Sequence, residues 1–155
     1  MQTTHRITAG LAGLGAATVL GFGLAGAATA GTMPITRPGE PTVAMTLTNH
    51  TDKTQYLIGA TPGQGGSWVN APKTRLAPGT SETITATAPF ANQLTVNAQY
   101  RVGLGGPVAN YEIHDSSHNV NTQFTGVSGN HAGNYWIHTN ISSHYPNANV
   151  GYDLW

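Results

Sequence analysis

The chain has no cysteine. This absence excludes disulfide bonds, a thiolate zinc site, haem attachment through Cys and a cysteine nucleophile. Charge is also scarce, because six Lys and Arg residues balance six Asp and Glu residues in a chain of 155. A chain with no excess of either sign lacks the electrostatic footprint of a protein that binds nucleic acid or anionic lipid. We therefore expect no nucleic-acid partner, and recognition of any other partner through hydrogen bonds, aromatic contacts and shape.

Only one long apolar run is present, and it lies at the N-terminus. Residues 1–6 are short and carry a fixed positive charge at Arg6, and residues 7–24 are apolar and rich in Ala, Gly and Leu. Small residues at Ala28 and Ala30 then match a signal-peptidase site. The pattern predicts a secretory signal peptide over residues 1–30, cleavage before Gly31 and an extracellular protein. A retained membrane anchor is the alternative, because the run approaches the length of a spanning helix.

Helical periodicity is missing from the rest of the chain, and a period of two replaces it. Residues 31–41 hold three prolines and two glycines, which predicts a flexible lead-in. From residue 42 to residue 155 apolar and polar residues alternate in short runs, the longest of which extends from Leu94 to Val102. The sequence therefore predicts an all-β domain over residues 42–155. We expect an antiparallel, immunoglobulin-like β-sandwich of about eight short strands, with residues 94–102 as a central strand.

Turn residues divide this domain into its expected elements. Val43 to Ile58 reads as a hairpin around the turn at residues 49–52, and residues 115–118 read as a second turn. Residues 126–133 read as a loop rich in Gly, Asn and Ser. The other expected strands cover residues 67–69, 82–88, 108–114, 120–124, 135–141 and 150–155.

Polar residues that could carry chemistry gather late in the chain. Spaced four apart, His114 and His118 would present two ligands to one metal on a helix, but the residues between them are typical of a turn. A zinc or copper site drawn from His114, Asp115, His118 and His138 is one alternative. A hydrolase site around His114, Asp115 and His118, with Ser116 as the neighbouring hydroxyl, is another. No Gly-x-Ser-x-Gly motif or pair of flanking acids supports hydrolysis. We predict surface histidines, no cofactor, no metal and no enzymatic activity.

The aromatic residues favour a binding function. Trp136 shares a strand face with His138, opposite Tyr135 and Ile137, so it points to solvent if Ile137 points to the core. An amphipathic ring suits a membrane interface, and its flat face suits stacking on a sugar. The alternative is that these rings cover one face of the sandwich. The predicted ligand-binding residues are Trp68, Trp136, His138, Tyr145 and Trp155.

Several segments occur in an order that resembles the aegerolysins and related haemolysin-like proteins, which are small secreted β-sandwiches. The first is an apolar strand that runs into Asn49-His50-Thr51, and the last is Gly133-Asn134-Tyr135, which opens a further strand. The segments between them are Gly66-Ser67-Trp68, Pro72, Leu76-Ala77-Pro78-Gly79, residues 103–108 and Tyr111-Glu112-Ile113.

The resemblance covers residues 43–155 and implies an aegerolysin-like sandwich that binds membrane lipid. Some members of the family also form pores with a larger partner protein. This chain lacks the family's Trp-rich second half, and no single lipid-contacting residue carries over. We therefore predict a lipid-binding module, with a glycan or a protein as the alternative ligand.

Overall fold

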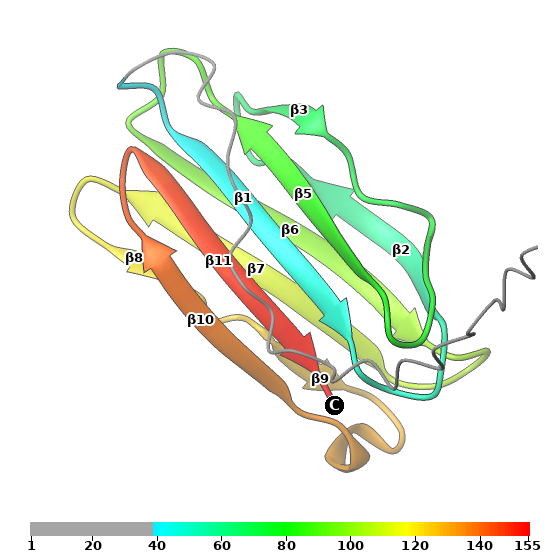
Figure 1. The fold of residues 1–155 in the computed structure, drawn as a ribbon. Helices are drawn as coiled ribbons and strands as arrows, with labels where there is room; N and C mark the ends of the chain where they lie inside the picture. The colour runs from blue at the N-terminus through cyan, green and yellow to red at the C-terminus, as the bar shows by residue number, and fades with distance from the viewer. Residues whose placement is uncertain (1–38) are drawn as a thin grey trace, which may run out of the picture.

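The computed structural model of the protein describes residues 39–155. The predicted signal peptide and most of the expected lead-in lie outside the described residues. Within residues 39–155, two multistranded sheets pack face to face (Figure 1). This arrangement confirms the predicted β-sandwich. In the same range no helix has the length and apolar character needed to span a membrane.

The first sheet has five strands in the order β10-β11-β1-β5-β3. All neighbouring pairs are antiparallel except β1 and β11, which run parallel with Met45 opposite Val150. The strands are β10 (Ile137–Ser143), β11 (Asn147–Leu154), β1 (Thr42–Asn49), β5 (Ser81–Thr87) and β3 (Ser67–Asn70).

The second sheet is antiparallel throughout and has the order β4-β2-β6-β7-β8, with β9 paired to β7. The longest alternating run of the sequence forms β6, and the sheet order confirms its predicted central place. Its strands are β4 (Arg75–Leu76), β2 (Gln55–Thr61), β6 (Gln93–Val102), β7 (Val108–Ser116), β8 (Val120–Asn121) and β9 (Gly126–Ser128).

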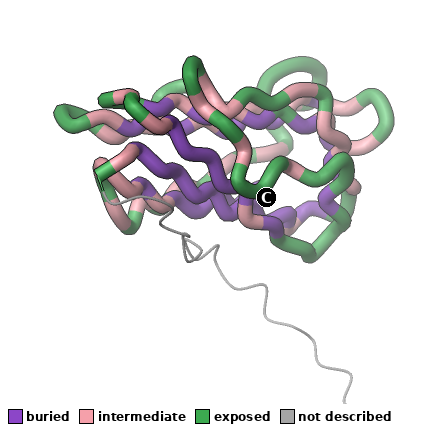
Figure 2. Tube along the Cα trace, turned by 90° about the horizontal axis from the view of Figure 1, so that it is seen from above, coloured by how far each residue is buried: buried purple, intermediate pink, exposed green. Residues whose placement is uncertain are grey.

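The core fills the space between the sheets because every second residue of the central strands points inward. Buried residues follow the strands in Figure 2, and exposed residues gather in the loops. Three tyrosines, Tyr100, Tyr111 and Tyr152, meet edge to face in the core, with centroid distances of 6.2 and 5.5 Å between neighbours. Each hydroxyl donates a hydrogen bond, to Glu82, Gln55 and the backbone oxygen of Glu112 respectively, so none is buried without a partner.

The predicted hairpin between residues 43 and 58 is wrong. Strands β1 and β2 belong to different sheets, and residues 50–54 carry the chain from one sheet to the other. The buried side chain of Asn49 holds this crossing. Its amide donates to the backbone oxygens of Lys53 and Leu76, and its oxygen accepts the hydroxyl of Thr51 at 2.8 Å. The sequence correctly predicts a turn after Asn49, but the local residues do not determine which sheet the chain enters next.

Four further boundaries differ from the predictions. The predicted turn at residues 115–118 begins too early, because β7 extends to Ser116. The predicted strand at residues 120–124 ends at Asn121, where β8 ends, and Phe124 lies in the loop that follows. The predicted loop at 126–133 contains β9 and the start of a short 3-10 helix, η1 (Ala132–Asn134). Strand β10 begins at Ile137, two residues later than predicted.

Candidate functional site

Three rings stack across one end of the first sheet. Trp136 and Trp155 face each other just beyond β10 and β11, and two backbone hydrogen bonds of 3.1 and 3.0 Å join them. Their ring planes are 14° apart, with centroids separated by 5.9 Å. The His50 ring, which follows β1, stacks on the other side of Trp155 at 3.8 Å and 4°. The stack therefore runs across three neighbouring strands.

Strand register explains why these rings meet. Asp153 pairs with His138 on one side and with Thr48 on the other, so all three point to the outer face of the sheet. Residues two positions further along the strands keep this orientation, which brings Trp136, Trp155 and His50 onto the same face. The parallel pairing of β1 and β11 is thus what places His50 beside Trp155.

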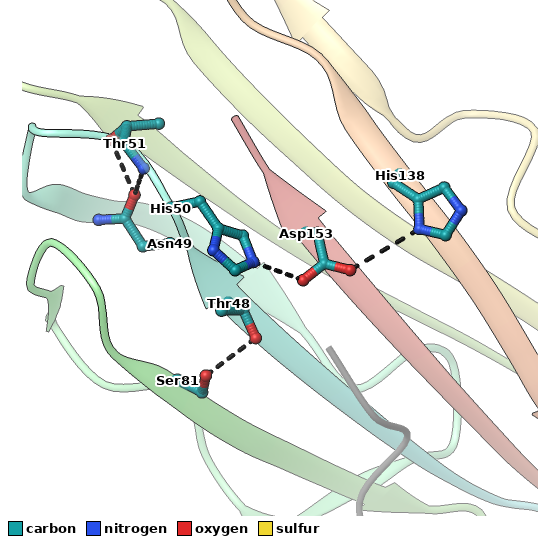
Figure 3. Close-up of polar contacts among 7 residues, drawn as sticks. All are labelled: Thr48, Asn49, His50, Thr51, Ser81, His138 and Asp153. Carbon is teal, nitrogen blue, oxygen red and sulfur yellow. Dashed lines mark hydrogen bonds and ion pairs between the residues drawn. The ribbon is translucent and has the colours of Figure 1, made fainter. Parts of the chain in front are cut away.

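The carboxylate of Asp153 lies between His50 and His138 and links the two histidines (Figure 3). Asp153 Oδ1 lies 2.7 Å from His50 Nε2, and Asp153 Oδ2 lies 3.7 Å from His138 Nδ1. The side chains of Asp153 and His50 are buried, whereas that of His138 is 57% exposed. In the described part of the chain, His50 Nδ1 has no hydrogen-bond partner. No hydroxyl is therefore aligned on this histidine as a Ser-His-Asp nucleophile would be. The close Asp153 contact instead fixes the ring that supports Trp155.

Large apolar side chains are exposed at this end of the sandwich. Trp136 is 57% exposed, Trp155 39% and Leu104, in the loop between β6 and β7, 91%. Leu104 lines a hollow of about 260 Å³, and Lys53 and Tyr135 are among the other residues that line it. Figure 1 shows the C-terminus and the loop after β9 at the same end. We call Leu104, Trp136 and Trp155 the tryptophan end.

The structure brings together three of the five predicted ligand-binding residues. Trp136, Trp155 and His138 lie at the tryptophan end or beside it. Trp68 does not, because it lies on β3 at the opposite edge of the sheet, where it is half-buried and packs against the core. Tyr145 does not either, because it lies in the turn between β10 and β11, far along the hairpin from Trp136.

Neighbours in sequence around Asp115 point in different directions. His114 is on the outer face of β7, where its Nδ1 lies 2.8 Å from the hydroxyl of Thr95. Asp115 points into the sandwich and is buried, whereas His118 is exposed and contacts Ser117. The geometry proposed for a hydrolase or metal site is thus not assembled here. Among residues 39–155, no group of three or more His, Cys, Asp or Glu side chains is placed to hold a metal ion.

Asp115 is nevertheless unusual. Both of its carboxylate oxygens are buried, and neither has a hydrogen-bond partner among the described residues. Burial removes water from the charged form, and this desolvation raises the pKa of Asp115 to about 7. The side chain is therefore a neutral acid over most of the acidic pH range.

Sequence analysis missed Leu104, His50 and Asp153. A single large apolar residue among Gly103, Gly105 and Gly106 was a readable signal for an exposed loop tip, because no strand pattern there could bury it. No sequence signal connects His50 with Asp153, because they meet only through the pairing of the first and last strands of the domain.

Comparison of the chain with protein-family models and with curated proteins gives no match.

Proposed function

We propose that this is a secreted, non-enzymatic binding protein that recognises membrane lipid through the tryptophan end. The observation that carries the proposal is the exposure of three large apolar side chains, Leu104, Trp136 and Trp155, at the same end of the sandwich. An exposed apolar group of this kind often marks an interaction surface. The predicted signal peptide and the resemblance to aegerolysins point in the same direction.

The chemistry of this end suits the boundary between lipid headgroups and acyl chains. Indole rings combine an apolar body with a polar N–H and favour that boundary, while a leucine at a loop tip can enter the acyl region. The neighbouring Lys53 forms an ion pair of 2.9 Å with Asp52, so it adds little net charge. Binding should therefore come mainly from apolar contact and depend only weakly on salt.

The first prediction concerns Trp136. The protein, mixed with liposomes of varied lipid composition, should show a blue shift of tryptophan fluorescence with one class of lipid. Trp136→Ala and Leu104→Ala should each weaken partitioning about tenfold, because each removes a side chain whose burial in lipid is worth about 1.5 kcal/mol or more. Liposome co-sedimentation measures the partition coefficient.

Phe90→Ala is the matched control for this experiment. Phe90 is also an exposed aromatic residue, 93% exposed, but lies in the loop between β5 and β6 at the other end of the sandwich. Its replacement should leave partitioning unchanged. Absence of a fluorescence shift with every lipid, or equal losses in Phe90→Ala and Trp136→Ala, would remove the lipid proposal.

Glycan recognition is the second candidate function. It is favoured by a groove on the other sheet, whose residues are separate from the tryptophan end.

A further inference from the structure

The outer face of the second sheet carries a groove of about 710 Å³. Its floor is formed by outward-facing residues of β6 and β7, and β9 with the loop before it forms one wall. This volume falls within the range of roughly 300–1,000 Å³ that is typical of ligand sites. The groove is independent of the tryptophan end, which is built mainly on the first sheet.

The floor of the groove carries several side-chain amides. Asn97 and Gln99 come from β6, and Asn110 and Glu112 lie beside them on β7, where Asn97 pairs with Glu112 and Gln99 with Asn110. A carboxamide both donates and accepts hydrogen bonds, as a sugar hydroxyl does. The four side chains thus present a mixed array of donors and acceptors on a rigid sheet.

Part of this array is held in place by its own hydrogen bonds. Asn97 Nδ2 donates to Asn110 Oδ1 at 2.8 Å, and Asn110 Nδ2 donates to the backbone oxygen of Phe124 at 2.5 Å. Among the described residues, the side-chain carboxylate of Glu112 accepts only a long contact of 3.5 Å, from Asn97 to its Oε2. Within residues 39–155, no hydrogen bond engages the side-chain amide of Gln99. Glu112 and Gln99 therefore keep hydrogen-bonding capacity for a ligand.

The wall adds an aromatic ring. Phe124 lines the groove and is 64% exposed. A ring beside an array of amides offers an apolar face to the C–H side of a sugar, while the amides bond its hydroxyls. The strand that the sequence predicts over residues 120–124 would not explain why the Phe124 side chain is exposed.

The charges of the lining residues further limit the kinds of ligand that fit the groove. No Lys, Arg or His is among the described residues that line the groove, and Glu112 is its one ionisable group. A phosphate, sulfate or carboxylate ligand would meet a carboxylate without a compensating cation. One carboxylate is also too few for a divalent metal site. We infer that the groove binds an uncharged oligosaccharide, with Gln99 and Glu112 bonding its hydroxyls and Phe124 stacking on a ring.

The test is an array of neutral and acidic oligosaccharides probed with the folded protein, followed by calorimetric titration with the best-bound compound. The wild type should bind neutral glycans and reject sialylated, sulfated and uronic-acid glycans. Gln99→Ala and Phe124→Ala should each weaken binding about tenfold, because each removes one ligand contact and leaves the strand pairing intact. Glu112→Gln, which removes the negative charge but keeps the shape, should admit acidic glycans.

Two matched variants separate a lost contact from a disturbed fold. Gln93→Ala changes the same residue type on the same strand and the same outer face, but outside the groove. Phe90→Ala removes an exposed phenylalanine remote from it. Both should bind like the wild type. The inference is overturned if no neutral glycan binds, if only acidic glycans bind, or if Gln99→Ala and Phe124→Ala bind as well as their controls. None of these outcomes bears on the liposome experiment, because the two surfaces share no residue.

Discussion

At the scale of single residues, Asp115 differs from Glu82, another buried acid, because neither of its carboxylate oxygens has a hydrogen-bond partner among the described residues. Glu82 is also buried, but it accepts hydrogen bonds from Tyr100 and from the backbone N–H of Lys73. Asp115 has no such donor among the described residues, and its pKa rises to about 7 because of desolvation. The two buried acids therefore differ in whether hydrogen-bond donors surround the carboxylate.

The buried Asp115 carboxyl predicts that the stability of the folded protein depends on pH. The unfolded chain releases this proton near the reference pKa of 3.8, whereas the folded chain holds it until about pH 7. The folded state therefore binds more protons between these values, and its stability falls as the pH rises through this window. The slope should reach about 1.4 kcal/mol per pH unit. Thermal unfolding from pH 4 to pH 8 measures it.

Asp115→Asn is the variant that isolates this contribution. Asparagine keeps the size of the side chain but cannot ionise, so the variant should lose most of the fall in stability and exceed the wild type in melting temperature at pH 8. A wild type whose melting temperature stays constant from pH 4 to pH 7, or a variant that keeps the full wild-type slope, would contradict the assignment.

At the scale of elements, prediction from sequence succeeded where the period of two was long and unbroken. The run that forms β6 shows both its strand character and its central place, because a strand paired on both edges and packed on one face needs apolar residues at every second position. The bounds of β8 and β9 were not predicted, because strands of two and three residues are too short to show a period of two. The pairing of strands was not predicted either, because the pattern of a strand indicates which face is buried but not which strand lies beside it.

The candidate site was likewise predictable from the sequence only in part. The outward direction of Trp136 was predictable from alternation with Ile137, and the structure confirms it. The stacking of His50 on Trp155 was not predictable, because it depends on the parallel register of β1 and β11. The groove residues Asn97, Gln99 and Glu112 were visible as outward positions, yet their convergence required the register of β6 and β7.

Strand order also predicts which strands unfold locally first. Strands β1 and β6 are each paired on both sides and lie at the centre of their sheets, whereas β8 and β9 are short and lie at the margin. Backbone amides of β1 and β6 should exchange with deuterium most slowly, and those of β8 and β9 should exchange soonest. Hydrogen exchange read by mass spectrometry measures the order. Equal protection of β9 and β6 would contradict it.

At the scale of the whole molecule, the two proposed surfaces are separate. The tryptophan end lies where β10 begins and β11 ends, together with the loop between β6 and β7 that carries Leu104. The groove lies on the outer face of the second sheet. The packed core between them is rigid, and no described residue belongs to both surfaces. We therefore expect independent binding at the two sites.

This independence can be measured directly. A saturating concentration of the best-bound neutral glycan should leave the liposome partition coefficient unchanged. Trp136→Ala should bind that glycan with wild-type affinity, and Phe124→Ala should partition into liposomes as the wild type does. A change of more than about threefold in any of these measurements would show coupling of roughly 0.6 kcal/mol or more between the sites.

The parallel pairing of the first and last strands has a further consequence, for the order of folding. Thr42 on β1 contacts Asn147 on β11 across a sequence separation of 105 residues. Until β11 has been synthesised, one edge of β1 has no partner strand and the first sheet cannot close. Contacts between such distant segments require closure of a long loop, which makes folding slow. The domain should therefore remain open through nearly all of its synthesis and complete its first sheet only when its final residues arrive.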